Sequence, residues 1–224
     1  MEMFLKKRNI PFEIVDLYQE NLLPTDRSRL GAIIVLGGPM NVDDENRFPY
    51  LIEEKSFIRR CVEDSVPVLG ICLGAQLLAR VFDAQVYKNQ HSELGCMDVE
   101  LTKEGMKNPL FDQISSPMTV FQWHGDTFDL PKGADLLAQS PACLHQAFSV
   151  NNRFYGLQFH IEAGWEDAQR WAAAYLPDLQ GAERKAAQAV LEIRRQEWSD
   201  SIQRDGWQLF ENFFVSIAGF NKRT

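Results

Sequence analysis

A cysteine lies between two glycines where the chain changes from an apolar run to a helical pattern. The run ends at Ile71, Cys72 follows, and Gly70 and Gly74 flank the cysteine. This order predicts a strand, a sharp turn and a helix, which lift the side chain at the turn clear of the sheet. The free N–H groups and positive dipole end of the helix favour a thiolate there. Cys72 is therefore a candidate nucleophile, with a small buried hydrophobic residue as the alternative interpretation.

A cysteine nucleophile needs a base and a group that orients the base. Residues 154–162 are predicted to form a strand that runs into a loop, and His160 lies at the end of this strand, two positions before Glu162. Residues two apart in a strand project to the same face, so Glu162 can accept from the imidazole while the other ring nitrogen faces the thiol. His-x-Glu is a weak signal alone. It gains weight because Cys72 and His160 are both expected beyond the carboxyl ends of strands, where open α/β sheets bind ligands.

A third candidate feature is the turn Gly37-Gly38-Pro39, which follows the apolar run over residues 32–36. The simplest interpretation is a tight turn between two elements. The functional interpretation is an oxyanion site, in which the N–H groups of Gly38 and Leu73 are the two donors.

The elements that must position these residues are predicted from hydrophobic periodicity. Continuous apolar runs at 32–36 and 66–71, with helical patterns at 51–62 and 75–82, indicate an open parallel α/β sheet covered by helices. The remaining predicted elements are a helix over 1–9, strands over 12–17 and 118–123, short strands within 86–101, and helices over 166–175, 182–198 and 207–217. We expect one domain over 1–224, with a catalytic core at about 1–165 and a helical segment at about 166–224 packed on it.

Composition excludes several partner classes. The 224 residues carry a net charge of −8, which argues against nucleic acid or an anionic membrane as the main partner. No stretch approaches the roughly 20 apolar residues that span a bilayer, and the first residues lack the layout of a signal peptide. The four cysteines show no Cys-x-x-Cys spacing, which suits a reducing cytoplasm and gives no zinc or disulfide signature. Three of them are expected to be small buried hydrophobic residues without a chemical role: Cys61, Cys96 and Cys143.

Several motifs together resemble the class I glutamine amidotransferases. Gly37-Gly38-Pro39, the block over residues 70–76 and the block over residues 156–162 occur in the family's order, and residues 122–128 form a fourth matching block. The chain looks like the stand-alone branch that is similar to the glutaminase domain of GMP synthase. The resemblance covers most of residues 12–165.

This resemblance implies a flavodoxin-like three-layer sandwich with a mostly parallel central sheet and extra C-terminal helices. It also implies a triad of Cys72, His160 and Glu162, a γ-glutamyl thioester intermediate and no requirement for a metal or cofactor. Gln76, His124 and Asp126 are implied to line the glutamine pocket. An acidic group near the substrate's amine is chemically sensible, although His124-Gly125-Asp126 would otherwise pass for an ordinary turn. Glu93 also matches the family pattern, with no role assigned.

The chain departs from the family pattern in two respects. Ile161 stands between the histidine and the glutamate, where the family usually has proline, which alters loop stiffness but keeps both triad side chains. Family members also begin with a strand before their first helix, whereas residue 1 already lies in the predicted helix. We expect either upstream residues or a sheet completed by another segment.

The function expected from these features is hydrolysis of the γ-amide of glutamine to glutamate and ammonia, with a separate synthetase as the ammonia acceptor. Residues 1–224 show no synthetase domain and no phosphate-binding loop, so hydrolysis of γ-glutamyl peptides or conjugates is the nearest alternative. A non-catalytic protein that binds glutamine or regulates a partner is an alternative of another class. Chaperones and proteases with a cysteine elbow lack the paired Gly-Gly-Pro and His-x-Glu blocks.

Overall fold

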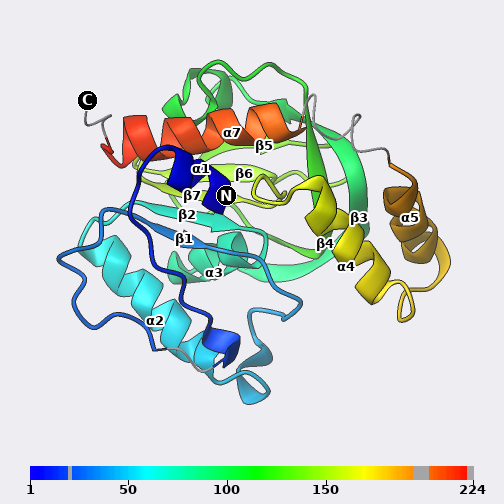
Figure 1. Ribbon diagram of the computed structural model, residues 1–224, viewed down its shortest axis with the longest axis horizontal. Helices are drawn as coiled ribbons and strands as arrows, with labels where there is room; N and C mark the ends of the chain where they lie inside the picture. The colour runs from blue at the N-terminus through cyan, green and yellow to red at the C-terminus, as the bar shows by residue number, and fades with distance from the viewer. Residues whose placement is uncertain (20–21, 194–201, 221–224) are drawn as a thin grey trace.

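The fold is an open α/β sheet with helices on both faces (Figure 1). The computed structural model describes residues 1–19, 22–193 and 202–220. In these residues the sheet has the strand order β1-β2-β7-β6-β5-β3-β4. The strands are β1 Ile33–Val35, β2 Val68–Ile71, β3 Val86–Leu101, β4 Met118–Phe128, β5 Asp135–Gln139, β6 Ala147–Val150 and β7 Phe154–Leu157.

The strands that lead into the site are parallel and buried. β2 pairs in parallel with β1 on one side and with β7 on the other, with Val68 opposite Ile33 and Phe154. Every residue of β2 and β7 is buried, as expected for strands covered on both faces. The remaining neighbours pair antiparallel. The predicted flavodoxin-like α/β sandwich is confirmed, with its parallel pairings gathered around β2.

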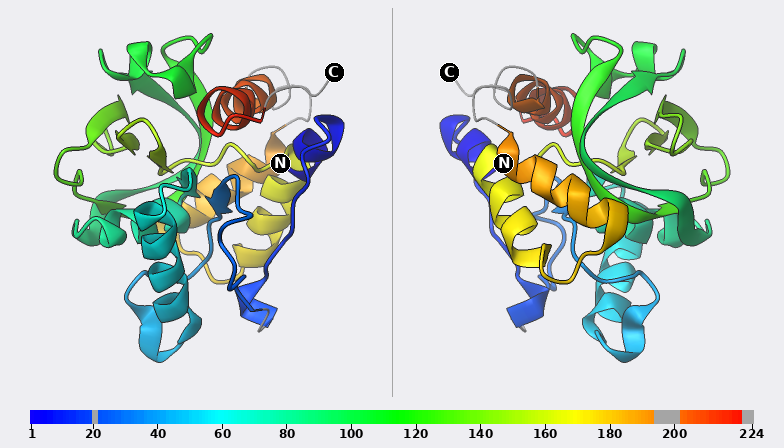
Figure 2. Two further views of the ribbon diagram at one scale, coloured as in Figure 1. Left: turned by 90° about the vertical axis from the view of Figure 1, so that its left-hand side faces the viewer. Right: turned by 90° about the vertical axis from the view of Figure 1, so that its right-hand side faces the viewer.

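Helices cover the sheet in groups that follow its alternating side chains (Figures 1 and 2). Val68 of β2 packs with the helices of one face, and its neighbour Leu69 packs with those of the other. One face is covered by α2 (Tyr50–Glu63) and α3 (Leu73–Val81), and the other by α1 (Glu2–Lys7), α7 (Arg204–Glu211) and a π-helix (Asn212–Ile217); α4 (Trp165–Tyr175) and α5 (Gly181–Glu192) lie beside β3 and β4. In the described parts of the chain, no helix combines the length and apolar character needed to cross a bilayer.

The close contact between α3 and the parallel strands depends on two glycines. A Cβ atom on Gly74 would lie 2.0 Å from the carbonyl oxygen of Val35 in β1, and one on Gly70 would lie 2.4 Å from the carbonyl oxygen of Gly74. Both distances are far below a van der Waals contact. The glycines therefore allow the helix to begin directly against the sheet, which places Cys72 at the turn between them.

Two predicted strand regions differ from the structure in their pairing, and a third, expected to extend to His160, ends at Leu157. Residues 86–101 form one long strand, interrupted by a bulge between Lys88 and Glu93, because β4 pairs with it along most of its length. Residues 12–17 contain no strand, and Phe12 and Ile14 are exposed. An extended segment becomes a strand only when its backbone N–H and C=O groups pair with a neighbour, and hydrophobic alternation alone does not supply one.

The predicted helices agree more closely with the structure. Helices occur where the sequence predicts them at the N-terminus, between β1 and β2, after Cys72, and over residues 165–175. The helix predicted over 182–198 spans Gly181–Glu192, and the predicted part from 194 onward lies outside the described residues. The last predicted helix, over 207–217, is α7 followed by a π-helical segment.

We expect Gly74→Ala to lower the free energy of unfolding by about 1–3 kcal/mol, because the new methyl group must displace either α3 or β1. Urea unfolding monitored by tryptophan fluorescence measures this change. Gly164→Ala is the matched control, since a Cβ there meets only flexible carboxylate oxygens at 3.5 and 3.7 Å. Equal stability of the two variants would contradict the close packing described above.

Candidate functional site

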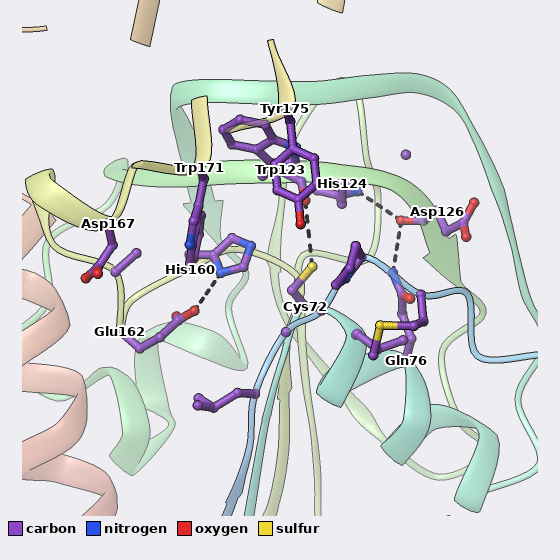
Figure 3. A pocket seen from close by; sticks show the side chains of 18 of the residues that line it. Cys72, Gln76, Trp123, His124, Asp126, His160, Glu162, Asp167, Trp171 and Tyr175 are labelled. Carbon is purple, nitrogen blue, oxygen red and sulfur yellow. Dashed lines mark hydrogen bonds and ion pairs between the residues drawn. The ribbon is translucent and has the colours of Figure 1, made fainter. Parts of the chain in front are cut away.

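A pocket of about 930 Å³ opens where the parallel strands end and α3 and α4 begin (Figure 3). Its walls come from the turn after β1, the start of α3, the second half of β4, the loop after β7 and helix α4. The structure brings all of the sequence-predicted site residues to this one pocket: Gly38, Cys72, Leu73, Gln76, His124, Asp126, His160 and Glu162.

Cys72 occupies a strained backbone conformation at the start of α3. Its φ of 53° and ψ of −110° lie in a region that residues with a side chain rarely adopt. The surrounding elements hold it there: its N–H donates to the carbonyl oxygen of Leu157 in β7 at 2.8 Å, and its own carbonyl accepts from the N–H of Gln76 at 3.1 Å. The thiol lies 3.7 Å from the carbonyl oxygen of Trp123. The side chain therefore points away from the sheet into the pocket (Figure 3).

His160 is fixed by its backbone and by Glu162. Its N–H donates to the carbonyl oxygen of Phe121 in β4 at 2.8 Å, and its Nδ1 lies 2.7 Å from Oε1 of Glu162. The second carboxylate oxygen of Glu162 accepts from the N–H of Ile161 at 3.0 Å. Proline has no N–H, so a proline at position 161 could not make this hydrogen bond, which holds the carboxylate.

The imidazole of His160 lies beside Cys72. A Cβ atom on Gly37 would lie 3.1 Å from Cε1 of His160 and 3.3 Å from Cβ of Cys72, so both side chains border the same glycine. Burial by itself lowers the pKa of His160, but the negative charges of Glu162 and Cys72 outweigh it and raise the pKa to about 10. The site therefore favours the protonated, imidazolium form of His160 beside the Cys72 side chain.

The opposite side of the pocket is a polar surface formed by α3, β4 and the turn after β1. The side-chain amide of Gln76 donates to the carbonyl oxygen of Asp126 at 3.4 Å and to Gln158 at 3.3 Å. The carboxylate of Asp126 accepts from Nδ2 of Asn41 at 2.6 Å. Nδ1 of His124 lies 2.9 Å from the carbonyl oxygen of Asp126, so several hydrogen bonds fix the conformation of this turn.

Glu93, which has no role in the sequence analysis, lies directly behind His124. It is 2% exposed, and its Oε2 lies 3.0 Å from Nε2 of His124. The same oxygen accepts from the side-chain amide of Gln146 at 2.8 Å, and Oε1 accepts from the hydroxyl of Ser140 at 3.1 Å. Both nitrogens of the His124 ring are therefore held, one by Glu93 and one by the turn at Asp126.

Glu93, His124 and Cys143 could also offer three ligand atoms to a metal, since these atoms lie within 4.8 Å of one another. Hydrogen bonds within the protein already engage them, however. Cys143 lies 3.2 Å from the hydroxyl of Thr127, and Glu93 and His124 are engaged as described above. The donor set therefore fits a buried hydrogen-bond network better than a metal centre.

Three aromatic residues of the pocket are absent from the sequence-predicted site. Trp171 packs edge-on against His160 at a centroid distance of 5.1 Å, and Trp123 lies 6.4 Å from Trp171 and 5.9 Å from Tyr175. We call Trp123, Trp171 and Tyr175 the aromatic wall. Trp171 and Tyr175 are four positions apart and therefore share one face of α4. This spacing is the sequence signal that could have identified them as neighbours. Periodicity indicates that such a face is apolar but not whether it covers a core or a cavity.

Comparisons with known proteins agree with this geometry. Residues 3–170 match the family model described as glutamine amidotransferase class-I. The glutamine amidotransferase-like protein YfeJ of Salmonella typhimurium is 31% identical over 184 residues, which cover 80% of this chain and 76% of YfeJ. A GMP synthase (glutamine-hydrolyzing) of Wolinella succinogenes is 35% identical over 161 residues, which cover 70% of this chain and only 29% of that protein.

Solved structures give the same result. The crystal structure of a glutamine amidotransferase from Thermotoga maritima matches with a TM-score of 0.85 and 32% identity, covering 98% of this chain and 91% of that one. The order of elements, the arrangement of the pocket and the family match over residues 3–170 converge. The chain belongs to the class I glutamine amidotransferase family.

Proposed function

We propose that this protein hydrolyses the γ-amide of glutamine to glutamate and ammonia through a thioester on Cys72. The observation that carries the proposal is the position of Cys72 at the N-terminus of α3, beside an imidazole that Glu162 holds at 2.7 Å. This combination supplies a nucleophile, a proton carrier and an orienting carboxylate. Membership of the class I family supports the same reaction.

In the proposed mechanism, the Cys72 thiolate attacks the γ-carbonyl carbon and a carbon–sulfur bond forms. The N–H groups of Gly38 and Leu73 hold the resulting oxyanion; Leu73 is the first residue of α3, where N–H groups lack intrahelical partners. His160 donates its proton to the nitrogen, the carbon–nitrogen bond breaks and ammonia leaves. Water then attacks the thioester while His160 takes up its proton, and glutamate is released.

The polar side of the pocket suits the amino acid end of the substrate. Glutamine carries an α-ammonium and an α-carboxylate, and the Asp126 carboxylate offers a partner of opposite charge to the ammonium. The carboxylate of Asp126 is held by a hydrogen bond from Asn41. Its backbone carbonyl oxygen is held by contacts with Gln76 and His124, so the carboxylate has a fixed position. We therefore assign substrate binding to Gln76, His124 and Asp126.

The proposed destination of the ammonia is a separate synthetase. The matched region covers only 29% of the Wolinella GMP synthase but 64% of a Thermoplasma acidophilum relative whose name describes it as one subunit of a glutamine-hydrolyzing GMP synthase. Such a name implies a further polypeptide that works with the relative. We also propose a cytoplasmic location, because all four cysteines are free thiols and the proposed nucleophile requires a reducing compartment.

Cys72→Ala should lower glutamine turnover by at least about 10⁴-fold, because the other groups cannot replace the nucleophile. Glutamate release measures this loss, and intact-mass spectrometry after treatment with a glutamine-like electrophile measures covalent labelling of Cys72. Cys96→Ser is the matched control, since Cys96 lies outside the pocket and is exposed, where the sequence predicted a buried residue. Full turnover by Cys72→Ala would refute the mechanism, and glutamine binding by wild type without labelling or turnover would favour a regulatory role.

Glu162→Gln should lower the pKa of His160 from about 10, because it removes a negative charge while burial remains. Because folding raises the pKa of His160, its protonation stabilises the folded protein. This stabilisation is fully present below pH 6.5, the pKa in the unfolded chain, and it is lost as pH rises through about 10. The free energy of unfolding should therefore fall more steeply between these pH values in wild type than in the variant. Urea unfolding across this range, with an NMR titration of His160, measures both effects; parallel curves would contradict the assigned pairing.

Glu93→Gln should raise the KM for glutamine more than it lowers kcat. The new amide group would place a donor opposite Gln146 or Ser140, which now donate to the carboxylate, and would loosen the His124 ring. Steady-state kinetics measures the split, and Glu100→Gln, at an exposed position of the same strand, is the control. A pure loss of stability with unchanged KM would show that Glu93 acts only in folding.

A further inference from the structure

The aromatic wall lies where the leaving group of the proposed reaction must depart. His160 donates a proton to the leaving nitrogen, so any substituent on that nitrogen lies on the His160 side of Cys72. That side is bounded by Trp171, which packs against the imidazole at 5.1 Å. Figure 3 shows Tyr175 and Trp123 on the same side of the cavity, with the carbonyl of Trp123 directed toward the thiol.

We propose that the aromatic wall is a subsite for the substituent of an N-substituted γ-glutamyl amide, with an aromatic or long apolar amine as the leaving group. This inference rests on the proposed function and extends it from glutamine to a class of larger substrates. Ammonia has no apolar surface to bury, so its release gives three aromatic rings no role. An aromatic or alkyl substituent would cover them.

The size and lining of the pocket support a substrate larger than glutamine. Its volume of about 930 Å³ lies near the upper end of cavities that enclose drug-sized ligands. Apolar side chains also border the pocket while remaining accessible: Tyr175 is 40% exposed and Leu36 is 42% exposed. Glutamine held at the polar side would leave this apolar surface in contact with water.

The packing of α4 against β4 accounts for the positions of only some of the rings in the aromatic wall. Phe121 lies 6.0 Å from Trp123 and 6.1 Å from Trp171, so these two rings also join the helix to β4. Tyr175 differs, because it ends α4 at the mouth of the pocket and its described ring contact is with Trp123. The structural tryptophan of this helix is Trp165, whose indole N–H donates to the carbonyl oxygen of Ile193 at 2.8 Å.

The reaction balances without another reactant besides water. The sulfur of Cys72 bonds to the γ-carbon, the carbon–nitrogen bond breaks, and the substituted amine leaves with the proton from His160. Water hydrolyses the thioester, returns a proton to His160 and releases glutamate. The products are glutamate and the free amine.

The test compares two unactivated amides that differ only in the substituent: γ-glutamyl-methylamide and γ-glutamyl-phenethylamide, with glutamine alongside. Glutamate release gives kcat/KM for each. We expect wild type to favour the phenethylamide over the methylamide by at least about tenfold, and Tyr175→Ala to reduce this ratio at least fivefold. Tyr18→Ala is the matched control, because Tyr18 is 70% exposed and lies outside the pocket.

Calorimetric binding to Cys72→Ala gives a second readout that needs no turnover. Tighter binding of the phenethylamide than of the methylamide, weakened by adding Tyr175→Ala, supports the subsite. Equal affinities and equal kcat/KM values overturn it, and if glutamine is then still hydrolysed, the proposed glutaminase function stands. Selective binding in the absence of any turnover by wild type retains the subsite and overturns the proposed function.

Discussion

The structure of the site depends on the close approach of α3 to the parallel strands. Because Gly70 and Gly74 have no side chains, α3 begins in close contact with β1 and β2. The chain must therefore turn sharply at Cys72, which lies between the two glycines. Cys72 therefore has a positive φ that a side chain disfavours, held by hydrogen bonds to β7 and within α3. The strain is local and the packing that maintains it is spread over the sheet. Sheet packing thus directs one thiol into the pocket.

The charge of the site follows from burial combined with pairing. An isolated buried imidazole would lose its proton, but Glu162 and Cys72 reverse that tendency for His160. Glu162 is itself held through the N–H of Ile161. Isoleucine at position 161 supplies a backbone N–H that proline lacks, and the carboxylate keeps its orientation toward the imidazole.

Sequence predicted which residues meet at the pocket better than it predicted the sheet. Cys72, Gly38 and His160 each follow a buried apolar run, and parallel strands necessarily bring such positions to one edge. The antiparallel half of the sheet was harder to predict from sequence, because the pairing of residues 86–101 with β4 depends on a partner that is distant in sequence. The strand predicted over residues 12–17 was wrong for the same reason, because a strand requires a neighbouring strand to pair with. Asn41 and Glu93 had no detectable roles because their contacts lie across the fold, with Asp126 and His124.

The two sides of the pocket differ in how firmly they are fixed. On the polar side, Glu93 and the turn at Asp126 hold the His124 ring from opposite directions, and this network continues through Gln146 to Gln122. Such a surface tolerates little variation in the group it binds, because a misplaced polar atom loses its partner. The side chains of the aromatic wall are held by ring contacts and apolar packing, with no described hydrogen bond from a ring of the wall to fix the shape of a neighbouring group. In the proposed reaction, the first surface would therefore select the γ-glutamyl group, and the second would admit variation in the attached amine.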